Sequence, residues 1–141
     1  MEKQKLKEAI RKTAKAIYKF LPVLVGVILL VSLANSLIPK SYYQVLFREN
    51  PVIDSFIGSF LGSILAGNPI TSYVIGGELL KQGISLIAVT AFLVAWVTVG
   101  VVQLPAESIL LGKKFAIARN LTAFIFAIIV SVIAVSILSM I

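Results

Sequence analysis

The sequence lacks cysteine and histidine altogether, and Asp54 is its only aspartate. Without cysteine the chain has no disulfide, no thiolate metal ligand and no thiol nucleophile. Without histidine it lacks the commonest metal ligand and the side chain that most readily transfers protons near neutral pH. We therefore expect no catalytic residues, no metal site and no cofactor, and we interpret the chain as something other than an enzyme.

Charged residues are also scarce, because Asp, Glu, Lys and Arg together make up only 13% of the 141 residues. Soluble domains average about 25%, so a soluble protein is disfavoured. Hydrophobic residues make up 59% of the chain, and the mean hydropathy is +1.02. Apolar runs of about 20 residues are typical of helices that cross a bilayer. The composition predicts an all-α integral membrane protein that crosses the plasma membrane several times and is surrounded by the lipid bilayer.

Basic residues are concentrated at the N-terminus, where seven of the thirteen Lys and Arg residues lie between Lys3 and Lys19. Apolar residues such as Leu6 and Ile10 recur at helical spacing among them, so residues 1–19 are predicted to form a basic amphipathic helix at the membrane interface. Its charge suits anionic lipid head groups, although a solvated helix that only sets the orientation explains the pattern equally well. Aromatic and basic residues form no surface suited to nucleic acid, so no nucleic-acid partner is expected.

The rest of the chain, residues 20–141, is interpreted as one membrane domain. At ~1.5 Å per residue, an apolar run of about 19 residues spans roughly 28 Å, close to one hydrocarbon core. Three full transmembrane helices are predicted, together with a re-entrant hairpin made of a broken helix. The predicted spans are 20–38, 84–103 with a continuation over 105–112, and 116–140, and the hairpin covers 53–82.

The hairpin is centred on the triplet Gly67-Asn68-Pro69, which a continuous helix would not tolerate. Proline lacks an N–H and disfavours the α conformation of the residue before it, whereas Asn is a good N-cap and Pro a good first helical residue. One helix is therefore predicted from about Ile53 to Ala66, and a second from Pro69. Broken backbone in hydrocarbon persists only where protein or a water-filled cavity covers it, and such breaks are typical of transport sites.

Two interpretations of the residues after this break stay open. The helix start offers free N–H groups and the positive end of a helix dipole, and Asn68, Thr71 and Ser72 add neutral donors and acceptors. Such a site suits an anion or a polar neutral solute. Alternatively, Asn68 only caps its own helix and Ser72 bonds to neighbouring backbone.

A second proline, Pro105, also stands at the start of a helical pattern. If it marks a break at membrane depth, Glu107 is a candidate proton-coupling group and Gln103 a polar wall; if it begins a loop helix, Glu107 lies at the surface. A short internal repeat favours two helix breaks. Pro69, Ser72 and Gly76 recur 36 residues later as Pro105, Ser108 and Gly112. The predicted substrate pathway consists of Asn68, Pro69, Thr71, Ser72, Gln103 and Glu107.

Small residues recur along the first arm of the hairpin, where they would allow two helices to approach closely in lipid. A second ridge of this kind runs through Ala123, Ala127 and Ser131. We expect the first arm to form the contact of a homodimer. The predicted helix-packing residues are Ser55, Gly58, Ser59, Gly62, Ser63 and Ala66.

The distribution of Lys and Arg predicts the orientation of the chain. With a re-entrant hairpin, the N-terminal cluster shares one side with Lys113, Lys114 and Arg119, which places ten basic residues there and three on the other. With a full crossing in place of the hairpin, the division is eight against five. Basic residues concentrate in cytoplasmic segments, so the hairpin with a cytoplasmic N-terminus is favoured.

The chain resembles the ArsP-type, YraQ-like predicted permeases over residues 58–120. The resemblance rests on the order and spacing of short segments rather than on any single motif. They read Asn68-Pro69-Ile70-Thr71-Ser72, Leu79-Leu80-Lys81-Gln82-Gly83, Ala91-Phe92-Leu93, Leu111-Gly112 and Ala118-Arg119.

The resemblance implies half of a two-repeat permease, which needs a second copy or a paired homologous half to complete it. The sequence departs from the family in two places. Members that handle trivalent arsenicals have a Cys-containing motif where this chain has residues 68–73, and a Pro-and-Asn segment expected soon after Ala91-Phe92-Leu93 is missing. We expect a permease half-unit with a pathway for a small polar solute or ion; the alternative is a structural or accessory membrane subunit that transports nothing.

Overall fold

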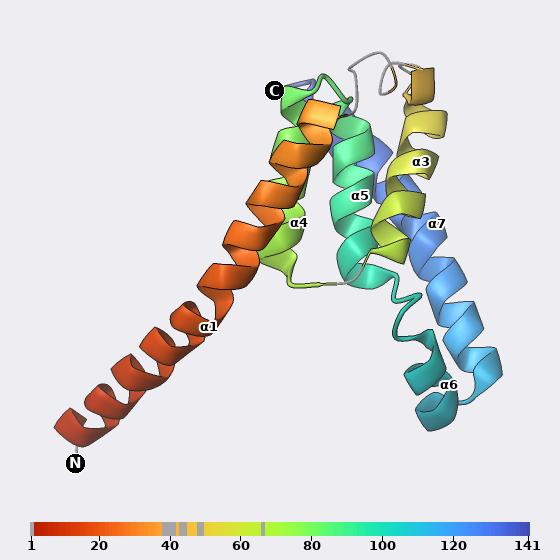
Figure 1. Cartoon of the computed structure of the whole chain (residues 1–141). Helices are drawn as coiled ribbons and strands as arrows, with labels where there is room; N and C mark the ends of the chain where they lie inside the picture. The colour runs from red at the N-terminus through yellow and green to blue at the C-terminus, as the bar shows by residue number, and fades with distance from the viewer. Residues whose placement is uncertain (1, 38–41, 43–44, 48–49, 66) are drawn as a thin grey trace. The chain divides into compact units, whose positions relative to one another are not determined.

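The structure is a computed structural model of the whole chain, and it describes residues 2–37, 42, 45–47, 50–65 and 67–141. Every regular element in these ranges is an α-helix, as predicted (Figure 1). The chain divides into two compact units, residues 1–37 and residues 38–141. Each unit is described by itself below.

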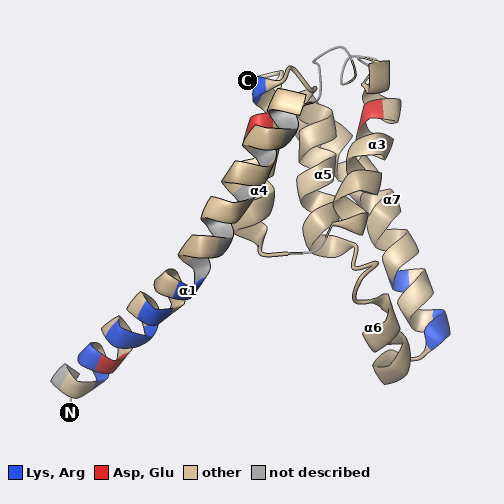
Figure 2. Cartoon of the chain, in the orientation of Figure 1, with Lys and Arg blue, Asp and Glu red and all other residues tan. Residues whose placement is uncertain are grey.

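The first unit is a single helix, α1 (Glu2–Leu37), of 36 residues. Its N-terminal half carries the basic cluster, shown in blue in Figure 2, and Glu8 pairs there with Lys12 at 2.8 Å. The sequence predicts an interfacial helix over residues 1–19 and a separate span over 20–38, whereas α1 runs through that boundary without interruption. Pro22 lies inside the helix, and the backbone is helical on both sides of it.

The second unit is built around α5 (Leu86–Thr98), which packs against three other helices (Figure 1). Ala88, Ala91 and Ala95 on this helix are almost completely buried, and their small side chains allow neighbouring helices to approach from several directions. The helices α3 (Pro51–Ile64), α4 (Pro69–Lys81) and α7 (Lys113–Leu138) pack on α5, while α6 (Leu104–Leu111) packs on α7.

Contact between α3 and α5 depends on two glycines. A Cβ atom added to Gly58 would lie 2.1 Å from the carbonyl oxygen of Ala88, and one added to Gly62 would lie 2.3 Å from that of Phe92. No side chain fits there, so the two backbones touch directly. The serines of this ridge are buried as well, whereas Ala66, predicted to belong to it, lies outside the described residues.

The predicted use of this ridge as a homodimer contact therefore needs correction. Its small residues already pack against a helix of the same chain, because α5 presents the complementary backbone surface at Ala88 and Phe92. A second copy cannot reach Ser55 or Ser59, since both are fully buried within the unit. The homodimer itself stays a prediction, without these buried serines at its contact.

Among the described residues, only α7 is long and apolar enough to cross a membrane by itself. Its 26 residues extend for about 39 Å, whereas α3 and α5, with 14 and 13 residues, reach only about 20 Å. The predicted span 84–103 ends early, at Thr98, because Val99 adopts an extended conformation. The predicted continuation begins separately at Leu104. Three full spans therefore stay a prediction.

The chain between α3 and α4 leaves the helical conformation close to the predicted place. Helix α3 ends at Ile64, two residues before the predicted end, and α4 begins at Pro69 with Asn68 as its N-cap. The two helices run in opposite directions (Figure 1), as the predicted hairpin requires. In the described part of the chain, however, they pack on α5 and not on each other.

Candidate functional site

Two interruptions of the helical backbone meet at one end of α5. The first includes Leu65, Gly67 and Asn68 and separates α3 from α4; the second, residues 99–103, separates α5 from α6. The indole Nε1 of Trp96 donates a hydrogen bond of 3.3 Å to the carbonyl oxygen of Gly67. The indole also packs edge-on against Phe92, with ring centroids 5.4 Å apart. Trp96 therefore holds the first break against the last turn of α5.

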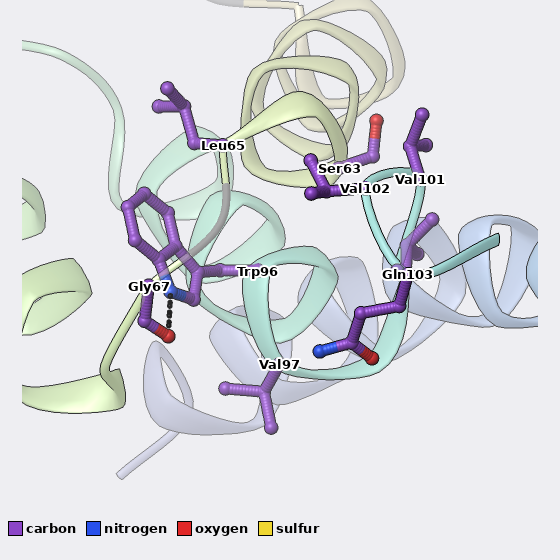
Figure 3. A pocket seen from close by; sticks show the side chains of 10 residues that line it. Ser63, Leu65, Gly67, Trp96, Val97, Val101, Val102 and Gln103 are labelled. Carbon is purple, nitrogen blue, oxygen red and sulfur yellow. Dashed lines mark hydrogen bonds between the residues drawn. The ribbon is translucent and has the colours of Figure 1, made fainter. Parts of the chain in front are cut away.

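A small pocket of about 40 Å³ lies between the two breaks (Figure 3). This volume exceeds the roughly 10–15 Å³ that one water molecule needs. Most of its exposed wall is polar although most of its side chains are apolar, and Gly67 and Gly100 can contribute only main-chain atoms. The lining residues come from the ends of α3 and α5 and from the breaks that follow: Ser63, Leu65, Gly67, Trp96, Val97, Val99, Gly100, Val101, Val102 and Gln103.

The polar side chains at the pocket are neutral. Gln103 lies along one side of it, as Figure 3 shows. Its role as a polar wall of a solute pathway stays a prediction. The hydroxyl of Ser63 donates to the carbonyl of Phe60 at 2.8 Å. Among the described residues that line the pocket, none carries a charge.

The residues predicted around the first break bond to their own helix, as in the interpretation that Asn68 only caps α4 and Ser72 bonds to neighbouring backbone. Asn68 Oδ1 accepts the N–H of Ile70 at 2.9 Å, and Ser72 Oγ donates to the carbonyl of Pro69 at 2.6 Å. Thr71 and Ser72 are buried. None of the four predicted residues at this break, Asn68, Pro69, Thr71 and Ser72, lines the pocket. Of all the predicted pathway residues only Gln103 does.

The last predicted pathway residue, Glu107, belongs to a polar cluster between α6 and α7. One of its carboxylate oxygens accepts from the guanidinium of Arg119, and the other accepts from Asn120 Nδ2 at 3.0 Å. Glu107 is largely buried, with 17% of its side chain exposed, against 38% for Arg119. The charge of the carboxylate is therefore neutralised inside the unit rather than presented at the surface.

Asn120 connects this cluster to the second break. Its Oδ1 accepts the N–H of Gly100 at 2.7 Å, and its Nδ2 donates to Ala116 as well as to Glu107. Arg119 adds a bond of 3.4 Å to the carbonyl of Thr98. The break and the cluster thus form one hydrogen-bonded system.

Sequence reasoning missed the partners of Glu107. Arg119 entered only through the Ala118-Arg119 segment and the count of basic residues, and the adjacent Asn120 carried no pattern of its own. The chain reverses at Gly112, whose φ of +87° favours glycine, and this turn brings α6 back along α7. A sharp Gly turn between two helical patterns is the one signal that pointed to such a pairing.

Two further acidic residues have structural contacts. Asp54 is buried at the start of α3, where its Oδ2 accepts from Ser85 Oγ at 2.8 Å. Ser85 in turn caps α5 by accepting the N–H of Ala88, so this bond joins the starts of α3 and α5. Glu78 pairs with Lys81, three residues later in α4, at 2.7 Å.

Comparison with known proteins identifies a family. The family model ArsP_1, described as a predicted permease, matches residues 5–140. The match includes both breaks, the pocket and the Glu107 cluster, and it is longer than the segment 58–120 that carries the sequence resemblance. No curated protein and no solved structure matches the chain.

Proposed function

The chain belongs to the ArsP_1 family of predicted permeases, and from this premise we propose that its two helix breaks form part of a solute pathway. Membership of a permease family favours transport across a membrane over catalysis. The observation that supports the location is the meeting of two breaks, one after Ile64 and one after Thr98, at a single pocket. Broken helices that face each other are typical of transporter binding sites.

The depth of the breaks supports this assignment. The N–H of Gly100 is bonded to Asn120, which lies seven residues, or about 10 Å, along α7 from its start at Lys113. If α7 crosses the bilayer, the second break lies beside a part of α7 that is within the membrane, and not beyond the end of the helix. Main-chain polar groups at such a depth must be paired or must face water, and a pocket between the breaks meets this requirement.

The proposed pathway is incomplete in one chain. Val101, Val102 and Gln103 line the pocket and are exposed, so a second wall is needed to separate them from lipid. We assign that wall to a second copy of the chain or to a paired homologous half, which makes this chain a half-unit. The N-terminus and the start of α7 are placed in the cytoplasm because both carry clustered basic residues.

Substituted-cysteine labelling tests the pathway, because the chain has no cysteine of its own. Ser63→Cys and Val102→Cys should react with a membrane-impermeant methanethiosulfonate reagent in intact cells or inverted vesicles. Ile129→Cys, on the exposed apolar face of α7, is the matched control and should not react. Lack of reaction at both pocket positions, with Lys3→Cys reacting from one side, would favour the accessory-subunit alternative.

A further inference from the structure

The helix ends that meet at the pocket are carboxyl ends. Helices α3 and α5 run in the same direction (Figure 1), and both stop at the pocket. The last carbonyl groups of a helix have no intrahelical N–H partner, and they form the negative end of the helix dipole. Two negative ends therefore converge on one small space.

At the end of α5, Asn120 accepts a backbone N–H that would otherwise pair with a carbonyl of α5. In a continuing helix the N–H of Gly100 would bond to the carbonyl of Trp96, but here it bonds to Asn120 Oδ1 at 2.7 Å. Within the described part of the chain, no hydrogen bond reaches the carbonyls of Trp96 and Val97. Both residues line the pocket, and both carbonyls belong to the unpaired carboxyl end of α5.

By contrast, N–H groups at the amino ends of the next helices, α4 and α6, are already hydrogen-bonded. At the start of α4, the N–H groups of Ile70 and Thr71 both bond to Asn68, through its side chain and its carbonyl, at 2.9 Å. At the start of α6, Glu107 donates its N–H to the carbonyl of Gln103 at 3.0 Å. The anion or polar solute expected at the start of α4 therefore finds few free donors, and Asn68 does not line the pocket.

The chemistry of the wall limits which cation fits. Mg²⁺ and Ca²⁺ sites use carboxylate ligands, and a stored proton needs a titratable group; neither lines the pocket among the described residues. Carbonyl oxygens at helix ends and neutral amide oxygens are the ligands of alkali ions in channels and transporters. We propose that this pocket binds a sodium or potassium ion, held by main-chain carbonyls at the ends of α3 and α5 with the Gln103 amide beside it. The proposal rests on the permease pathway and names one of its ions.

The thermal unfolding of the full chain in lipid nanodiscs tests the proposal. The midpoint should rise saturably with NaCl or KCl when choline chloride keeps the ionic strength and chloride constant. Equal midpoints in sodium, potassium and choline would overturn it. A midpoint that depends on chloride against gluconate, and not on the cation, would assign the pocket to an anion instead.

Two substitutions that give Gln103 opposite charges lead to opposite expectations. Gln103→Glu should lower the half-saturating alkali-ion concentration at least about tenfold, because it places a full negative charge beside the ion. Gln103→Lys should abolish the saturable response, since its ammonium repels the ion. An anion site would show the reverse order. If either variant fails to fold, the pair Val102→Asp and Val102→Lys applies the same test from a neighbouring position.

The cation proposal and the pathway proposal can be refuted separately. If Val102→Cys reacts with the impermeant reagent while alkali ions leave the midpoint unchanged, the cation proposal is wrong and the pathway stands. If Val102→Cys stays unreactive and alkali ions have no effect, both are wrong.

Discussion

Trp96 and Gly67 lie 29 residues apart in the sequence, yet the indole N–H of Trp96 donates to the carbonyl of Gly67. The ring also lies 3.1 Å from the position that a Cβ atom on Gly67 would occupy. This contact ties the linker between α3 and α4 to the helix at the centre of the unit. It also explains why a tryptophan lies in the middle of an apolar segment, since its one polar atom has a partner there.

Trp96→Phe keeps an aromatic ring against Phe92 but removes the N–H donor and one of the two fused rings. We expect it to lower the free energy of unfolding by at least about 1 kcal/mol, the usual net value of one hydrogen bond, because packing is lost as well. Reversible unfolding in mixed micelles measures this. Gly67→Ala should cost a similar amount or more, because its methyl group forces the indole to shift; no loss in either variant would contradict the contact.

Gly58→Ala should strongly destabilise the packing of α3 on α5. The new methyl group would meet the carbonyl of Ala88 at 2.1 Å, and a backbone atom cannot move aside as a side chain can. We expect a loss of about 3 kcal/mol or more, at the upper end of the range for overpacked cores.

Gly77→Ala is the matched control, because nothing lies within 4 Å of a Cβ there. Alanine is the better helix former by about 1 kcal/mol, so this variant should be neutral or more stable. Equal destabilisation by the two substitutions, measured by unfolding or by the yield of folded protein, would contradict the close approach.

Glu107 and Arg119 should behave as a coupled pair. Glu107→Gln leaves the Arg119 guanidinium without its carboxylate, and we expect a loss of about 1–2 kcal/mol, reduced from the buried-pair value because Arg119 is partly exposed. A double-mutant cycle with Arg119→Gln measures the coupling directly. Additive losses would show that the contact contributes no stability.

Asn68 is expected to act through its cap. Asn68→Leu removes the acceptor for the N–H of Ile70 and should cost about 1 kcal/mol, while Asn68→Asp keeps that acceptor and should preserve stability. Both should leave Val102→Cys reactive. If Asn68→Leu instead abolishes transport with expression and oligomer size intact, and Asn68→Asp does the same, the amide contacts solute.

The orientation of the chain follows from its basic residues. Lys3→Cys should be labelled only from the cytoplasmic side, because ten Lys and Arg residues are placed there against three on the other side. A homodimer of chains with one fixed orientation is then parallel, with its two-fold axis along the membrane normal. Labelling from both sides would refute fixed orientation, and a monomer in both mild detergent and lipid would refute the dimer.

Features that depend on neighbouring residues could be predicted from the sequence alone. Its composition determined the membrane class and the all-helical fold, since long apolar runs and scarce charge leave few alternatives. The start of α4 at Pro69 and its cap at Asn68 were predicted because both follow from local backbone preferences. The family resemblance was confirmed by the match over residues 5–140. The early end of α5 at Thr98 was missed, because the β-branched, apolar run that follows is compatible with a helix.

Contacts between distant residues were decided only by the tertiary structure. A ridge of small residues shows that some backbone comes close, but not whether that backbone belongs to another copy or, as at Gly58, to α5 of the same chain. The polarity of the pocket likewise depends on which helix ends meet, and this follows from α3 and α5 running side by side in one direction. Glu107 received its charged partner only when the turn at Gly112 brought α6 against α7. Sequence spacing carries no information on such pairings, because they are set by how the helices pack.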